Sequence, residues 1–159
     1  MILVLLGTFH IPFSRPLVQL HELCAAGKLH EELMVQNGHT GYSSPYFQSF
    51  PFIDPGLLDK LYDSARLIIT HAGTGSIIKG LKKKKKVIAI ARRHHLGEHI
   101  DDHQLEILNE FAGSGYILPW REQDRLEDVL QQAETFRPHH YVSQKKEIVH
   151  YLQNYIDSL

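Results

Sequence analysis

The sequence predicts an α/β fold with a doubly wound, mostly parallel, Rossmann-like sheet. Short apolar runs alternate with stretches whose apolar residues follow helical spacing. Small residues or an Asn-Gly pair end several of these runs, as turns after strands commonly do. Strands that alternate with helices form right-handed βαβ units, and such units build a parallel sheet covered by helices on both faces.

The start of the chain predicts a buried strand followed by a helix and a further strand. Residues 2–6 are continuously apolar and stop at Gly7, which is typical of a strand in a parallel sheet. Pro16 suits the first turn of the helix, and Gly27 suits its end. Residues 32–36 predict the next strand, which an Asn-Gly turn closes.

A loop and a short strand are expected next. Residues 39–49 are rich in Gly, Ser and Tyr and indicate a loop, whereas residues 50–53 predict a brief third strand. Pro51 limits that strand to an edge or an end of the sheet. Asp54 is a good helix N-cap, and Pro55 is a good first helical residue. The buried stripe of this helix is expected to be Leu57, Leu58, Leu61 and Tyr62.

Further strands are predicted at residues 67–70 and 87–91, where apolar residues again run together. The helix between them carries apolar residues at helical spacing. Thr74 or Ser76 would cap this helix, because hydroxyl side chains accept from the first free N–H groups of a helix.

The end of the chain predicts three helices and one strand. Asp101 would cap a helix with Gln104 at its third position, a variant of the capping box. Residues 116–118 suit a strand, and residues 126–133 suit the helix after it. The last helix, at about 142–157, carries an apolar stripe that either packs on its own sheet or docks on a partner. The stripe consists of Ile148, Leu152, Tyr155, Ile156 and Leu159, with Tyr151 beside it.

The composition is that of an ordinary soluble domain. Its 159 residues suit one domain covering 1–159, and 17 Lys and Arg against 18 Asp and Glu argue against a nucleic-acid binder. Cys24 is the single cysteine, so a reducing compartment fits best. The apolar start lacks the basic region of a signal peptide, and no apolar stretch reaches the ~18 residues that a membrane helix needs.

Histidine is the compositional outlier, with 12 residues. On a helix, His95, His99 and His103 would share a face, which brings a metal site into consideration. Gly97 interrupts that turn, however, and the carboxylate–histidine spacing of known zinc motifs is absent. We therefore expect no metal, and a polar loop rich in hydrogen-bonding side chains instead.

Polar loops follow the predicted strands at the edge where parallel sheets bind ligands. Gly7 and Thr8 follow the first strand, and this pair taken alone indicates a structural turn. The turn at 71–76, His-Ala-Gly-Thr-Gly-Ser, opens a helix whose N–H groups and dipole favour an anion. The chain lacks GxGxxG and GxxxxGK[ST], so a diphosphate held by backbone and hydroxyl groups is favoured over tight packing of small residues.

A third loop is crowded with groups that can bind hydroxyls. Carboxylates and an amide are suited to the vicinal hydroxyl groups of a ribose or hexose. The alternative is a solvated acidic turn with a helix cap. The residues concerned are Glu98, Asp101, Asp102, His103 and Gln104.

Together these segments resemble a known family. Residues 71–77, 87–92 and 97–106 closely resemble the C-terminal domain of family 28 glycosyltransferases. The resemblance is greatest to short bacterial capsule and exopolysaccharide subunits of the PssE/EpsF type, which are related to the Alg13 half of the split eukaryotic N-acetylglucosaminyltransferase. Residues 7–8 and 12–17 are similar to the N-terminal Gly-Thr and Pro-Phe-x-Arg-Leu signature of that group.

The resemblance implies the donor-binding half of a GT-B enzyme that works with an Alg14-like, membrane-anchored, acceptor-binding subunit. The implied reaction is inverting, independent of metal and cofactor, and moves a hexose from a UDP-sugar to a polyprenyl-diphosphate-linked saccharide. The chain would be cytoplasmic and peripheral at the inner face of the cell membrane, held there by its partner. The alternative is a non-catalytic nucleotide-sugar-binding subunit that stimulates a partner glycosyltransferase.

The resemblance also implies which residues would serve the reaction. The donor-binding residues would be Gly7, Thr8, His71, Gly73, Thr74, Gly75, Ser76, Glu98, Asp102 and Gln104. No general base is identified, and His10 and His71 are candidates. The chain departs from the family at Lys79, where relatives carry a ribose-binding acid, and at 82–86, where Gly-Lys-Pro is usual. Ala91 also replaces a usual proline. Ribose contacts therefore stay open.

Overall fold

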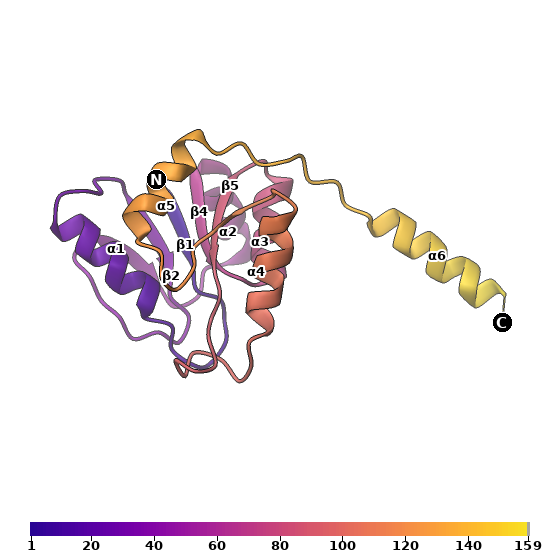
Figure 1. Cartoon of the computed structure of the whole chain (residues 1–159), viewed down its shortest axis with the longest axis horizontal. Coiled ribbons are helices and arrows are strands. Elements are labelled where there is room, and N and C mark those ends of the chain that lie inside the picture. Colours follow the sequence, from indigo (N-terminus) through magenta and orange to yellow (C-terminus); the bar gives the residue numbers. More distant parts are fainter. Residues whose placement is uncertain (159) are drawn as a thin grey trace.

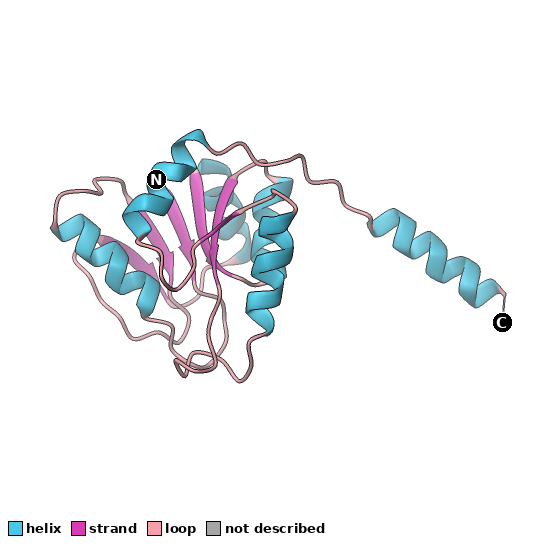
Figure 2. Cartoon of the chain, in the orientation of Figure 1, coloured by secondary structure: helices cyan, strands magenta, loops and turns pink. Residues whose placement is uncertain are grey.

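The computed structural model describes residues 1–158 and contains a six-stranded, parallel sheet between layers of helices (Figures 1 and 2). The strands are β1 (Ile2–Leu5), β2 (Leu33–Gln36), β3 (Phe47–Phe50), β4 (Leu67–His71), β5 (Lys86–Ile90) and β6 (Leu118–Pro119). The helices are α1 (Arg15–Ala25), α2 (Pro55–Ser64), α3 (Thr74–Lys82), α4 (His103–Gly113), α5 (Leu126–Thr135) and α6 (Lys145–Asp157).

The two faces of the sheet carry separate apolar cores, because successive strand residues point to opposite sides. In β1, Ile2 and Val4 join the core that contains Leu17 of α1 and Val129 of α5. Leu3 and Leu5 join the opposite core, which side chains of the other helices complete. Those side chains are Tyr62 of α2, Ile77 and Leu81 of α3, and Leu108 of α4. The predicted α/β sheet covered on both faces is confirmed.

The strand order places the end of β1 beside the end of β4. The sheet runs β3-β2-β1-β4-β5-β6, and all neighbouring strands in it are parallel. The chain therefore winds outward from β1 on one side and outward from β4 on the other. Loops at such a reversal diverge and leave a crevice at the carboxyl edge, where ligands of open α/β sheets bind.

Local signals at two helix starts agree with the structure. Pro16 lies in the first turn of α1, and the carboxylate of Asp54 accepts hydrogen bonds from Gly56 N and Leu57 N at 2.9 and 3.2 Å.

The predicted buried stripe of α2 is only partly right. Tyr62 is buried and Leu58 and Leu61 are partly buried, but Leu57, in the first turn of the helix, is 48% exposed.

The predicted third strand was wrong in position. The strand is β3 at Phe47–Phe50, so it takes up the end of the predicted loop and stops before Pro51. Residues of β3 are mostly exposed, which removes the apolar pattern that marks the other strands. Pro51 has no N–H to continue the ladder, and its carbonyl accepts from Gly38 N instead.

Boundaries near the end of the chain also shift. The predicted strand at 116–118 is the shorter β6 at Leu118–Pro119, because Gly115 at φ +70° turns the chain before it. The last helix, α6, begins at Lys145 rather than near residue 142.

Helix α6 lies apart from the body at the end of an extended segment (Figure 1). None of its described residues is buried, so of the two alternatives left open by the sequence, packing on its own sheet is contradicted. The side chains of Leu152, Tyr155 and Ile156 are 50%, 57% and 64% exposed. Leu159, the last residue of the predicted stripe, lies outside the described residues. Within residues 1–158, the structure contains no helix of the length and hydropathy required to cross a membrane.

Candidate functional site

The N-terminus of α3 opens onto the carboxyl edge of the sheet without a cap. Gly73 occupies the N-cap position, and no side chain accepts a hydrogen bond there. The predicted cap by Thr74 or Ser76 was wrong, because both residues already belong to the first turn of the helix. The first N–H groups of a helix have no partner inside it. Together with the helix dipole, they favour a negatively charged group at this position.

His71 fills the space between two glycine turns. A Cβ added at Gly7 would lie 2.8 Å from Cε1 and Nε2 of the His71 ring, and a Cβ at Gly73 would overlap Nε2. Gly7 also has φ +79°, a conformation that glycine adopts without strain. The loop after β1 and the loop after β4 therefore approach each other around this one imidazole.

The imidazole of His71 is held neutral. Burial lowers the pKa of His71 to about 4; the hydrogen bond to the Leu5 carbonyl opposes this shift, and the positive charge of nearby Arg92 adds to it. Its Nδ1 lies 3.3 Å from the carbonyl oxygen of Leu5, and since a carbonyl only accepts, Nδ1 carries the proton. The other ring nitrogen, Nε2, is then an unprotonated acceptor beside Gly73.

Arg92 and Glu98 join the loop after β1 to the loop after β5. Arg92 is 1% exposed, and its guanidinium donates to the carbonyls of Leu6 and Ile11 at 3.0 and 2.6 Å. Glu98 is buried and accepts two bonds from Arg15, at 2.9 and 2.7 Å. The carboxylate of Glu98 also accepts from Arg93 N at 3.0 Å, so its oxygens are already engaged within the protein.

The other residues predicted to bind a donor lie at different depths around this loop. Gln104 is buried, and its Oε1 accepts from Arg92 N at 3.1 Å. Asp102 is exposed and accepts from His94 N and Arg93 Nε, both at 3.1 Å. These contacts, the His94 hydrogen bond first, lower the pKa of Asp102. The predicted capping box is wrong, since Asp102 is the N-cap of α4 and Gln104 turns toward Arg92.

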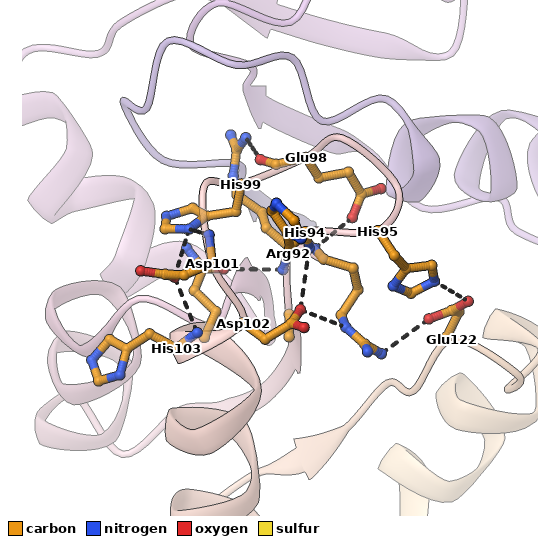
Figure 3. Close-up of polar contacts among 12 residues, drawn as sticks. Arg92, His94, His95, Glu98, His99, Asp101, Asp102, His103 and Glu122 are labelled. Carbon is orange, nitrogen blue, oxygen red and sulfur yellow. Dashed lines mark hydrogen bonds and ion pairs between the residues drawn. The ribbon is translucent and has the colours of Figure 1, made fainter.

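Three histidines of this segment pair separately with carboxylates, as Figure 3 shows for His95 and Glu122. His95, His99 and His103 contact Glu122, Asp101 and Glu106 respectively. Their spacing does not produce a common helical face, because α4 begins only at His103. Within the described part of the chain, no three His, Cys, Asp or Glu side chains are arranged to hold a metal ion. His10 is exposed beside Phe9, with ring centroids 4.6 Å apart.

The family model of the glycosyltransferase family 28 C-terminal domain matches residues 11–158. The chain belongs to this family. The UDP-N-acetylglucosamine transferase subunit ALG13 of Candida albicans is 39% identical over 61 residues, which are 38% of this chain and 20% of that protein. The subunit of the same name from Candida glabrata is 42% identical over 52 residues, 33% of this chain and 24% of that protein. The matched segments thus span about a quarter of these relatives or less.

Solved structures with the same fold include glycosyltransferases. The glycotransferase of kitacinnamycin superposes with a TM-score of 0.62 at 19% identity, over 83% of this chain and 34% of that chain. The solution structure of ALG13 gives 0.57 at 18% identity, over 95% and 94%. Acinetobacter baumannii MurG gives 0.53 at 20% identity, over 83% and 40%. At these identities the likeness shows the fold, and it confirms the predicted fold class.

In this family 28 domain, the prediction from sequence missed two arginines that connect the loops, the buried Arg92 and the half-buried Arg15. Arg15 and Arg92 both lie within segments that resemble the family, but neither was predicted as a site residue. Arg92 carried a usable signal, since it is a charged residue placed directly after the apolar run of β5. Charged residues are rarely buried unless they are paired, so an arginine at that point indicates a polar network.

Proposed function

We propose that this chain is the donor-binding, catalytic subunit of a two-part inverting glycosyltransferase. The proposed donor is a UDP-hexose, and the proposed acceptor is a polyprenyl-diphosphate-linked saccharide used in capsule or exopolysaccharide synthesis. Membership of family 28 supports sugar transfer, and two relatives named as UDP-N-acetylglucosamine transferase subunits support a UDP-sugar. No metal or cofactor is required in this proposal.

The observation that carries the proposal is the uncapped start of α3 beside Gly7 and Gly73. Its free N–H groups, with the hydroxyls of Thr74 and Ser76, would bind the diphosphate of the donor. When the sugar–phosphate bond breaks, negative charge develops on the departing diphosphate. Fixed donors and a helix dipole directed at that charge lower the barrier, because they need no reorganisation during the reaction.

The buried charged groups at the inner side of the site support an anionic ligand. Arg15 and Arg92 contribute two guanidinium groups to the inner side of the site, and Glu98 contributes one carboxylate that pairs with Arg15. Among these inner groups, the positive charge of Arg92 is therefore in surplus. A UDP-sugar, which carries a diphosphate, would offset this surplus charge.

Residues of the third loop would contact the hydroxyl groups of the donor. The side chain of Asp102 is 47% exposed, so a carboxylate oxygen can accept from a sugar hydroxyl in addition to its contact with Arg93. Gln104 holds Arg92 N with its oxygen, which leaves its amide N–H₂ as the donor toward a sugar. Glu98 would support the same loop through Arg15.

The acceptor would be held by a separate membrane-anchored subunit of the Alg14 type. The exposed apolar face of α6 supports this, because an amphipathic helix with no partner in its own body suits docking on another protein. The chain would then sit at the cytoplasmic face of the membrane through this partner. His10 and His71 are its own candidates for the general base.

The test is transfer by the chain purified together with a candidate Alg14-like subunit, given single UDP-sugars and lipid-linked acceptor. Replacing both hydroxyls in Thr74→Ala/Ser76→Ala should lower kcat about a hundredfold. Ser64→Ala is the matched control, because the Ser64 hydroxyl donates only to Lys60 O at the end of α2. Transfer unchanged in the double variant would contradict the proposed site. Donor binding without turnover, with every candidate partner, would favour the stimulating accessory subunit.

A further inference from the structure

Arg92 is a buried arginine whose charge lacks a dedicated carboxylate. It is 1% exposed, and all three of its guanidinium hydrogen bonds reach backbone carbonyls. The nearest acid, Glu98, already forms a two-bond ion pair with Arg15. The Nε of Arg92 is buried without a hydrogen-bond partner in residues 1–158. A buried cation in such surroundings is costly, so a structural role alone would be served better by an uncharged side chain.

The three carbonyl contacts of Arg92 come from both sides of the candidate site. Leu6 O and Ile11 O belong to the loop after β1, which carries Gly7 and Thr8. Glu98 O, at 3.0 Å, belongs to the loop after β5. The planar guanidinium can reach both loops at once because its N–H groups point in fixed, divergent directions.

Aromatic rings extend this connection outward. The guanidinium of Arg92 lies 4.8 Å from the ring centroid of Phe13 and 5.7 Å from that of Phe9. The Phe9 ring in turn stacks on His99 of the other loop, with centroids 4.5 Å apart. Cation–π contacts of this kind are strengthened when the cation is removed from water. The two loops thus meet around one charge and one aromatic stack.

We propose that Arg92 is a positioning residue that couples the loop after β1 to the loop after β5, so that an anion bound at the N-terminus of α3 also orders residues 93–102. This inference rests on the proposed donor site and adds how that site communicates with the loop for the sugar. The bound diphosphate would offset the positive charge of Arg92 and so stabilise the contact between the loop after β1 and the loop after β5. Burial lowers the pKa of Arg92 to about 10, which agrees with a charge that gains from an anionic ligand.

The test is amide hydrogen exchange of the full chain, with and without inorganic pyrophosphate. Arg92→Lys keeps the charge but cannot span both loops, so exchange without ligand should rise about tenfold or more at residues 7–13 and 93–102. Exchange in β1 and β4 should not change. Arg66→Lys is the matched control, because Arg66 pairs with Glu31 and Glu134 at the opposite edge of the sheet.

The effect of pyrophosphate distinguishes ligand-dependent coupling of the two loops from a role in which Arg92 only supports the loops without ligand. In the wild-type protein it should protect residues 93–102 as well as residues 72–76, whereas in Arg92→Met it should protect only residues 72–76. Wild-type exchange rates in both loops of Arg92→Lys, or protection of both segments in Arg92→Met, would overturn the coupling. If pyrophosphate protects no segment of the wild-type protein, the anion site is contradicted. The comparison of Arg92→Lys with the wild-type protein without ligand still tests whether Arg92 holds the two loops.

Discussion

The ring of His71 lies where a side chain at Gly7 would have to be: a Cβ there would come within 2.8 Å of Nε2. Gly7 lies in the loop after β1, and His71 ends β4, the neighbouring strand in the sheet, although most of the N-terminal half of the chain separates the two residues. Their contact brings the two glycine turns of the candidate site together. It also makes glycine at position 7 necessary for two independent reasons, its positive φ and the adjacent ring.

Gly7→Ala should therefore destabilise the protein by about 2–3 kcal/mol, from backbone strain at positive φ together with displacement of the ring. Urea unfolding measures this change in the free energy of unfolding. In Gly7→Ala/His71→Ala the ring is gone, so the added cost of the glycine substitution should fall to about 1–2 kcal/mol. Equal costs in both backgrounds would show that the ring does not restrict position 7.

His71 should make stability depend on pH in the acidic range. Its pKa of about 4 in the folded protein lies below the ordinary value of 6.5, so between these values only the unfolded chain binds the proton. The free energy of unfolding should consequently fall by up to about 3 kcal/mol as pH drops from 6.5 to 4. His71→Asn keeps a donor near Leu5 O and should lose this part of the pH dependence. An identical pH profile in the variant would contradict the buried, neutral ring.

Lys84 should be replaceable by glycine with a gain in stability. It is the one non-glycine residue with positive φ within the described chain, at +56°, directly after the C-cap of α3. Lys84→Gly should raise the free energy of unfolding by about 0.5–1 kcal/mol, since glycine has no Cβ to strain there. Lys82→Gly is the control inside the helix and should have the opposite sign. Thermal melting of both variants decides this.

Deleting residues 144–159 should separate stability from recruitment. None of the described residues of α6 is buried, so the truncated chain should keep its melting temperature within about 2 °C. Association with a membrane-anchored partner should be lost, as measured by co-sedimentation with membranes that contain the candidate subunit. Membrane recruitment equal to that of the full chain would rule out docking through this helix.

The fold could be predicted because burial and periodicity agree along most of the chain. β1, β4 and β5 are almost wholly buried, and their apolar runs identify them without further information. β3 is exposed at the sheet edge, so its residues carry no such pattern and its position was missed. Local capping was predicted correctly at α2, where Asp54 caps the helix, and incorrectly at α3, whose open end faces the site, and at α4, where Gln104 turns to Arg92 N.

The candidate site was predictable only in its local parts. The glycine and hydroxyl residues of the turn at 71–76 indicate an anion site by themselves, because they are consecutive in the sequence. Arg92 reaches carbonyls of residues that lie 81 and 86 positions away, and Arg15 pairs with Glu98 across 83 positions. Such partners are determined by the strand order of the sheet, which the sequence pattern does not specify.

The diphosphate site at the N-terminus of α3 is tested most directly by the donor affinity of Gly75→Ala. No atom lies within 4 Å of a Cβ built at Gly75, so alanine fits and should favour the helix by about 0.5–1 kcal/mol. A methyl group at the first turn of α3 would, however, obstruct the approach of a diphosphate. Gly113→Ala is the matched control, because Gly113 ends α4 and a Cβ there is equally unobstructed.

Calorimetric titration with UDP and with the preferred UDP-sugar supplies the measurement. Gly75→Ala should melt no lower than the wild-type protein yet bind UDP about tenfold or more weakly, a loss of about 1.4 kcal/mol. Gly113→Ala should bind UDP as the wild-type protein does. Unchanged UDP affinity in a folded Gly75→Ala protein would contradict a diphosphate site at the N-terminus of α3.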